Sequence, residues 1–250
     1  MENSKDTLKT VFDSINKNNL WNSEESVSGT GSEISNTKSL INKIKILLGI
    51  LDIDCIIDLG CGDFNWFKYV GYNRNYHGFD IVSDVIRKCR SYNILNYRFE
   101  VRDIVNDNLF NDINPSNNKL IISRDVLVHL SNEDINKIIK KIISSDAKYF
   151  LTTTFPSVDI NANIQPGMWR PINISAYPFN FPNPIMIINE DYKGEYIKNF
   201  KFDNFKFEGL SNENIMILKS INSHNKDLQY KDKSMGLWLV DDIRKHYEKY

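Results

Sequence analysis

The sequence predicts an α/β fold, a doubly wound and mostly parallel seven-stranded sheet with helices on both faces. Three observations predict it. Short aliphatic runs alternate with helical patterns from residue 39 to residue 155. The first run, CIIDLGCGD at residues 55–63, begins with aliphatic residues and ends in two glycines that have an acid on either side. Two further apolar runs lie nearer the carboxyl end. Such alternation is typical of parallel strands joined by crossover helices.

The elements follow in order along the chain. Strands are expected over residues 55–60, 76–82, 97–104 and 147–155, with a fourth strand that begins at residue 119 and ends at SRD (123–125), and two closing strands over 184–190 and 236–240. Helices are expected over residues 39–51, 65–71, 83–93 and 131–145. Ser83 is the expected N-cap of the third helix, and Ser131 with Asp134 resembles a capping box at the fourth.

The length and composition of the chain exclude several classes of protein. The chain of 250 residues suits one domain over residues 1–250 and carries a net charge of −1. Without a basic field to attract phosphates, a nucleic-acid partner is not expected. Apolar stretches are too short for a membrane span, and no signal peptide is indicated. Cys55, Cys61 and Cys89 have no metal-ligand spacing, so reduced thiols in a cytoplasmic protein are expected.

Three segments lie outside the alternating region. Residues 1–36 are polar and include SGTGS at 28–32, which reads either as a flexible linker or as a segment that covers a ligand. Six of the seven prolines fall within residues 156–184, a pattern typical of a binding loop or lid. Residues 191–233 are polar with alternating aromatics and predict an insertion that contains a hairpin.

The glycines after the first strand indicate a ligand. A strand, a glycine turn and a helix direct backbone N–H groups toward a bound molecule. A dinucleotide fingerprint would carry a third glycine where Asn65 stands. Asp58 precedes Gly60, and a carboxylate there would repel a pyrophosphate but attract an ammonium group. This charge favours a ligand with an amino-acid moiety, such as S-adenosylmethionine. The alternative is that the glycines only end a strand and the acids only cap helices.

DLGCG, residues 58–62, resembles the first motif of the class I S-adenosylmethionine-dependent methyltransferases, which have a Rossmann-like fold. The resemblance covers about residues 28–155 and implies S-adenosylmethionine as the cofactor. Phe64 departs from it, because many members have a further glycine there. The resemblance and the strand ends together give these cofactor-binding candidates: Asp58, Gly60, Gly62, Asp80, Ile81, Asp103, Ile104 and Arg124. Of these, Asp80 matches the ribose-binding acid, and Asp103 with Ile104 matches the pair that holds adenine.

A narrower resemblance concerns the acceptor. Several short motifs resemble those of a bacterial and viral subgroup of this family that is linked to glycan or small-molecule modification. They are SGTGSE, SRDVLVHLS, and WRPINI with PFNFP and GLWLV. The proline-rich loop offers side chains that suit a sugar, namely Trp169, Arg170, Asn173 and Tyr177. Aromatic faces pack on sugar rings, while Arg and Asn bind hydroxyls or phosphates. For Phe179 and Phe181, packing in a core beneath the loop is the favoured interpretation.

The fourth strand predicts the catalytic groups. Asp125 and His129 follow it at a spacing of four, so on a helical turn they would share a face and hydrogen-bond. His129 could then remove a hydroxyl proton, with Asp125 fixing its tautomer. The alternative is that His129 packs the following helix. No spacing demands a metal, although Asp125, His129 and Asp159 could hold one.

These observations favour a methyltransferase that O-methylates a sugar, nucleotide-sugar or glycan, with a small-molecule or sugar acceptor as partner. A protein or RNA methyltransferase is the alternative enzyme. A non-catalytic nucleotide-binding or partner-binding module with the same fold is the alternative from another class.

Overall fold

The computed structural model describes residues 8–191, 209–221 and 233–248. Its seven strands form one sheet in the order β3-β2-β1-β4-β5-β7-β6. The strands are β1 (Cys55–Leu59), β2 (Asn75–Asp80), β3 (Tyr97–Val101), β4 (Lys119–Ser123), β5 (Tyr149–Thr154), β6 (Met186–Asn189) and β7 (Ser234–Leu239). Only β7 runs antiparallel to its neighbours β5 and β6. The predicted mostly parallel seven-stranded sheet is confirmed.

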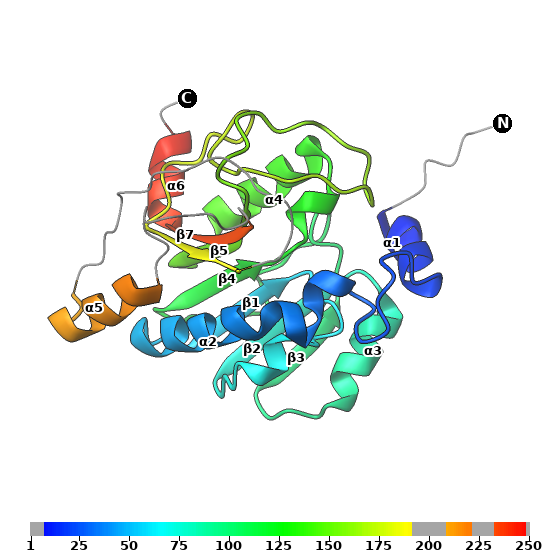
Figure 1. Cartoon of the computed structure of the whole chain (residues 1–250), viewed down its shortest axis with the longest axis horizontal. Coiled ribbons are helices and arrows are strands. Elements are labelled where there is room, and N and C mark those ends of the chain that lie inside the picture. The colour runs from blue at the N-terminus through cyan, green and yellow to red at the C-terminus, as the bar shows by residue number, and fades with distance from the viewer. Residues whose placement is uncertain (1–7, 192–208, 222–232, 249–250) are drawn as a thin grey trace.

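Helices cover both faces of the sheet, as Figure 1 shows. One face is packed by α2 (Ile34–Ile50), α3 (Ser83–Ser91) and α5 (Asn212–Ile221). The other is packed by α4 (Asn132–Ser144), α6 (Val240–Tyr247) and the loop over residues 156–184. Helix α1 (Leu8–Lys17) lies apart, near the carboxyl ends of the strands. The isoleucines of α4 point into the second core, because they recur at helical spacing.

Several element boundaries differ from the sequence prediction. Ser131 is the N-cap of α4 as expected, with its hydroxyl accepting the Asp134 N–H at 3.1 Å. Ser83 is not a cap, since Val82 holds that position and donates its N–H to the Asp80 carboxylate instead. Helix α2 begins at Ile34 rather than at residue 39. The helix expected over residues 65–71 is a single 3₁₀ turn, Phe67–Tyr69.

Two loops replace helices that a doubly wound sheet would have. Residues 102–118 join β3 to β4 without a helix, and their apolar side chains, Ile104, Val105, Leu109 and Ile113, pack in the second core. In the proline-rich loop, Phe179 and Phe181 are 1% and 4% exposed, so their predicted core role is confirmed. The hairpin expected within residues 191–233 falls largely outside the described residues. The described part of that range contains α5, which was not predicted.

Candidate active site

Strand β1 ends in a turn whose backbone requires glycine. Gly60 and Gly62 have φ angles of +80° and +55°, in the left-handed region that side chains disfavour. A Cβ at Gly60 would lie 2.4 Å from Val126 Cγ2, and one at Gly62 would lie 2.2 Å from Ser28 Oγ. The N–H groups of Gly60 and Cys61 both donate to the Phe79 carbonyl, which binds the turn to β2. The glycines are therefore needed both for conformation and for close packing.

Phe64 has a backbone conformation that usually requires glycine. Its φ is +60°, a left-handed value that is uncommon for a bulky side chain. The ring is 1% exposed and packs edge-on against Tyr76, Tyr97 and Phe99. Aromatic packing thus holds the backbone where glycine would otherwise be expected.

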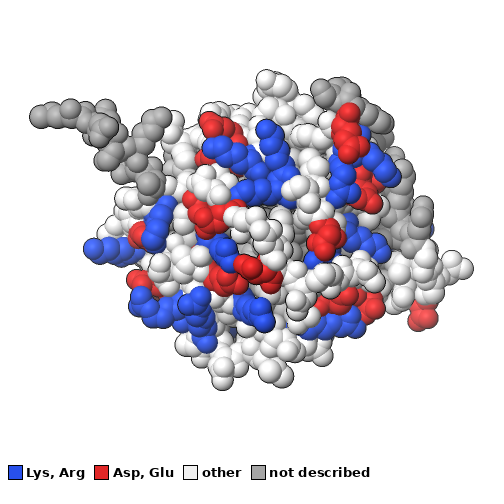
Figure 2. All heavy atoms as spheres, turned by 180° about the vertical axis from the view of Figure 1, so that it is seen from behind, with Lys and Arg blue, Asp and Glu red and all other residues white. Residues whose placement is uncertain are grey.

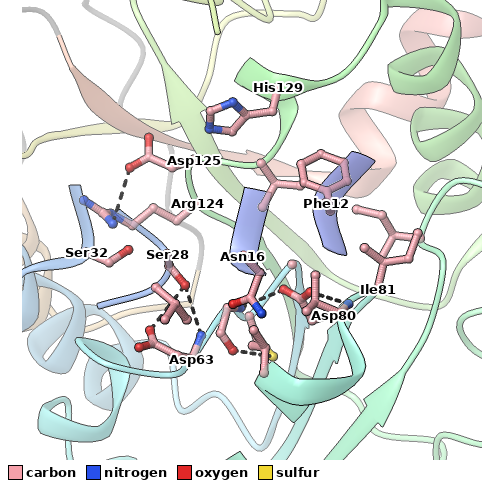
Figure 3. A pocket seen from close by; sticks show the side chains of 18 of the residues that line it. Phe12, Asn16, Ser28, Ser32, Asp63, Asp80, Ile81, Arg124, Asp125 and His129 are labelled. Atoms are coloured by element: carbon pink, nitrogen blue, oxygen red, sulfur yellow. Dashed lines mark hydrogen bonds and ion pairs between the residues drawn. The ribbon is translucent and has the colours of Figure 1, made fainter. Parts of the chain in front are cut away.

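A cavity opens beside this turn, at the carboxyl ends of β1, β2 and β4 (Figure 3). Its volume is about 970 Å³, the open solvent at its mouth included. One end is apolar and is lined by Leu8, Phe12, Ile81, Val82, Val85, Ile104 and Val105. The other end is polar and is lined by Ser28, Ser32, Arg124, Asp125 and His129. The cavity therefore suits an elongated ligand with one apolar and one polar end.

Two predicted acids, Asp80 and Asp103, also line the cavity. The Asp80 carboxylate accepts N–H bonds from Gly62 at 3.0 Å and Val82 at 2.9 Å. Burial raises the pKa of Asp80, and these bonds oppose the rise. Asp103 accepts N–H bonds from Val105 and Asn106 and lines the cavity as well. Both acids stabilise the turn at their own strand end while they face the cavity.

Asp58 is not among the residues that line the cavity, and the prediction that its charge attracts a ligand's ammonium group stays a prediction. It is 5% exposed and accepts the Tyr76 hydroxyl at 2.5 Å. Burial raises the pKa of Asp58 to about 7, although the bond from Tyr76 lowers it. The strand turns this side chain toward the first core, where a hydroxyl and not solvent satisfies it.

Residues 21–33 are bound to the glycine turn by buried polar contacts. Asp63, fully buried, accepts hydrogen bonds from the hydroxyls of Ser26 and Ser28 at 2.8 and 3.2 Å. The Asn65 side chain donates to Glu25 and to the Ser32 carbonyl. The segment that sequence reasoning left as linker or cover is thus packed along the cavity. The N-terminal region also lines the cavity with side chains that were not among the predicted site residues, namely Phe12, Asn16, Trp21, Val27, Ser28 and Ser32. Of these, only Ser28 and Ser32 lie in the SGTGSE motif.

Four charged side chains lie together at the polar end, of which Arg124, Glu190 and Lys233 are buried and Asp125 is partly exposed. Arg124 forms a bidentate pair with Glu190 at 2.6 and 3.2 Å, and Lys233 pairs with Asp125. Arg124 also donates to the Gly31 carbonyl at 2.9 Å and lies over the Trp66 ring. The two cations and two anions balance, which is the usual condition for burying charge. Sequence reasoning missed Glu190 and Lys233.

His129 lines the polar end, but its partner is not the one predicted. Its Nδ1 lies 2.9 Å from the Met168 carbonyl, and its ring lies 4.9 Å from the Trp21 ring. Asp125 instead pairs with Lys233 and Arg124, from a backbone with φ of +58°. That left-handed residue interrupts the helical turn, so the expected Asp125–His129 hydrogen bond does not form. Burial lowers the pKa of His129.

The predicted acceptor residues do not converge on the cavity. Trp169 and Tyr177 are 58% and 66% exposed and lie outside its lining. Arg170 is 5% exposed and donates to loop carbonyls, and the Asn173 amide donates to the carbonyls of Pro156 and Val158. Arg170 and Asn173 therefore bind the chain itself. Their assignment to acceptor binding stays a prediction.

Further features of the molecule concern metal ligands, membrane-spanning helices and cysteines. Within residues 8–191, 209–221 and 233–248, no three His, Cys, Asp or Glu side chains are placed to hold a metal ion, so Asp159 does not join Asp125 and His129 in such a group. In the same ranges no helix has the length and apolarity to cross a membrane. All three cysteines are free and buried.

The chain is similar to known methyltransferases in part of its sequence and in its fold. Residues 53–163, fewer than half of the chain, match a family model described as a methyltransferase domain. The chain is similar to magnesium protoporphyrin IX methyltransferase of Synechocystis PCC 6803 with bound SAM, at 16% identity and a TM-score of 0.47, over 65% of this chain and 81% of that one. It is similar to the N-methyltransferase NodS of Bradyrhizobium japonicum WM9, at 12% identity and a TM-score of 0.36, over 46% of this chain and 61% of that one.

A further similar structure is the PH0226 protein of Pyrococcus horikoshii OT3, at 23% identity and a TM-score of 0.37, over 46% of this chain and 53% of that one. No curated protein matches the sequence. The family match spans β1 to β5 and the loop that follows, including the glycine turn and His129. Residues 53–163 are thus similar to a methyltransferase domain.

Proposed function

We propose that this protein transfers a methyl group from S-adenosylmethionine to a hydroxyl of a small polar acceptor, most simply a sugar or nucleotide-sugar. The observation that carries the proposal is the cavity, which joins an apolar end at the β2 and β3 termini to a polar end that contains His129. S-adenosylmethionine, when bound, supplies an electrophilic methyl group. The protein's residues have to bind it, orient it and accept the proton of the acceptor.

The apolar end fits the adenosine part of this cofactor. Ile81 and Ile104 offer aliphatic surfaces for a purine, and Asp80 and Asp103 stand at the ends of the same two strands. Of the carboxylates that line the cavity, Asp63 pairs with Lys88 and Asp125 pairs with Lys233, whereas Asp80 and Asp103 form no ion pair among the described residues. These two acids favour a ligand with a net positive charge, as the sulfonium cofactor has.

The polar end fits an uncharged acceptor group. Arg124 and Lys233 are both paired with carboxylates, which makes them poor partners for an acceptor phosphate or carboxylate. The Met168 carbonyl can only accept, so His129 donates through Nδ1 and leaves the Nε2 lone pair to take a proton. A lowered pKa keeps that nitrogen unprotonated at neutral pH. These groups support removal of a hydroxyl proton.

RNA is disfavoured as an acceptor by the charge distribution. On the face shown in Figure 2, Lys and Arg side chains are interspersed with Asp and Glu and form no continuous basic field. Nucleic-acid binding needs such a field, because contacts to phosphates supply most of the affinity. A non-catalytic module is disfavoured by the presence of both a cofactor-shaped cavity and a free imidazole nitrogen.

Binding and turnover test the proposal. S-adenosylmethionine and S-adenosylhomocysteine, but not NAD, are expected to raise the melting temperature, and Asp80→Asn is expected to weaken this effect. Labelled cofactor incubated with a panel of sugars, nucleotide-sugars and glycans should yield an O-methylated product. His129→Gln should lower turnover by about 10²- to 10⁴-fold at unchanged cofactor affinity. Binding of NAD without binding of S-adenosylmethionine would refute the proposal.

A further inference from the structure

Arg170 is a buried arginine whose partners are all uncharged. It is 5% exposed, and within the described chain it has no carboxylate partner. Its Nε donates to the Ala162 carbonyl at 2.8 Å, and its two terminal nitrogens donate to the Leu127 carbonyl at 3.0 Å and to Asn132 Oδ1 at 2.9 Å. One guanidinium thus joins the proline-rich loop to both ends of the segment that carries His129.

The main chains of the two segments are also paired. The Gly167 N–H donates to the His129 carbonyl at 2.9 Å, and the Arg170 N–H donates to the Val128 carbonyl at 3.1 Å. Met168 lies between these two bonds, and its own carbonyl meets His129 Nδ1 at 2.9 Å. The position of that carbonyl therefore depends on how residues 167–170 are held against residues 127–132.

The carbonyl decides which imidazole nitrogen carries the proton. In a neutral histidine one ring nitrogen donates and the other accepts, and the partner of one fixes the state of the other. A carbonyl at Nδ1 selects the Nδ1–H form, which leaves Nε2 as the basic nitrogen. Without that carbonyl, the ring could place its proton on Nε2 and lose its function as a base.

Charged groups around the ring come from three segments. Asp125 follows β4 and favours the protonated imidazole, whereas Lys233, at the start of β7, and Arg170, in the proline-rich loop, disfavour it. Burial is the largest cause of the lowered pKa of His129. Burial also lowers the pKa of Arg170 to about 10, which leaves the guanidinium charged at neutral pH. Arg170 thus adds a positive charge near the ring in addition to its hydrogen bonds.

We propose that Arg170 is a positioning residue for the base: its guanidinium holds the Met168 carbonyl against His129, so that Nε2 stays free to accept the acceptor's proton. The proposal rests on the proposed function, since it assigns His129 as the base. The competing interpretation is that Arg170 only secures the loop, in which case its loss would lower stability and leave the imidazole unchanged.

The ring can be observed without any acceptor. Long-range proton–nitrogen NMR of the ¹⁵N-labelled full chain distinguishes the two tautomers, and His129→Gln identifies the signal among the four histidines. Wild type should show the Nδ1–H form. Arg170→Lys, which keeps the charge but loses the three-pronged contact, should lose that form in favour of Nε2–H. Arg170→Gln should also raise the pKa of His129, because the nearby charge is removed.

A matched control exists at the other end of α4. Arg244 likewise donates to main-chain carbonyls, those of Ile143 and Ser145, at 2.9 and 3.0 Å. Arg244→Lys should therefore reproduce a loss of stability but leave the His129 tautomer unchanged. If Arg170→Lys does not fold, Asn132→Ala, which removes one acceptor of the guanidinium, should shift the tautomer partially in a folded protein.

Turnover gives the second readout. Arg170→Lys should lower kcat by about 10²-fold, the usual cost of a misplaced group, with KM for the cofactor unchanged. Retention of the Nδ1–H form in both Arg170 variants, or an equal tautomer change in Arg244→Lys, would overturn the proposal. If the tautomer changes as expected but no acceptor is methylated, the proposed function fails and the positioning of the ring by Arg170 stands.

Discussion

Phe64 allows a direct test of how the turn after β1 is stabilised. At most buried sites glycine is a worse replacement for phenylalanine than alanine, because glycine loses more backbone entropy on folding. Phe64 has a φ of +60°, where alanine is strained and glycine is not. We therefore expect Phe64→Gly to be at least as stable as Phe64→Ala.

The magnitudes can be worked from the structure. Either substitution removes a ring that is 1% exposed, which typically costs about 3–5 kcal/mol. The left-handed backbone costs alanine roughly 1–2 kcal/mol, which glycine avoids. Glycine loses about 0.5–1 kcal/mol through the greater flexibility of the unfolded chain. The net difference is between zero and about 1.5 kcal/mol in favour of glycine.

Phe67 is the matched control. It is 2% exposed and packs on the same aromatic cluster, but it lies in a 3₁₀ turn and has no positive φ. Phe67→Gly should be less stable than Phe67→Ala by about 0.5–1 kcal/mol. Urea unfolding followed by circular dichroism gives all four free energies, provided that the m-values agree. Equal glycine penalties at both sites would show that Phe64 is unstrained and that the aromatic ring does not hold the turn.

Two further predictions concern the same turn. The pKa of Asp58 rises from 3.8 to about 7 on burial, so the folded state retains its proton where the unfolded state has lost it. The stability from this group should fall as the pH rises from about 4 to 7, by at most about 4 kcal/mol, and Asp58→Asn should abolish that dependence in urea titrations of the ligand-free protein. Gly62→Ala should weaken cofactor binding because its Cβ meets Ser28 Oγ, and adding Ser28→Ala should restore part of the affinity measured by calorimetry. No restoration would mean that backbone strain alone causes the loss.

The strands, and the acids at their ends that line the cavity, were predictable because their signals are local. An aliphatic run that ends in glycine and acid marks a strand end within a few residues, and the carboxyl ends of parallel strands share one edge of the sheet. Asp80 and Asp103 therefore lie together for the reason that predicted them. The predicted cap at Ser83 was wrong, because the helix already begins at Ser83 and Val82 occupies the cap position.

The polar end of the cavity could not be predicted in the same way. Arg124 meets Glu190 across 66 residues of sequence, and Lys233 meets Asp125 across 108. No periodicity or motif connects such partners, which only the folded sheet brings together. The spacing of four between Asp125 and His129 was a local signal, but it assumed a helix, and the left-handed backbone at Asp125 breaks that assumption.

The polar residues of the proline-rich loop show why a side chain's chemistry is not enough to assign its function. A long loop without regular structure must satisfy its own buried carbonyls and N–H groups. Asn161 donates its amide to the carbonyls of Asn173 and Tyr177, Asn173 donates to those of Pro156 and Val158, and Arg170 donates to Ala162. Arginine and asparagine in such a loop are therefore expected first as partners of the backbone. The role proposed for Arg170 depends on where its contacts lie, because one of the segments that it secures carries the Met168 carbonyl to His129.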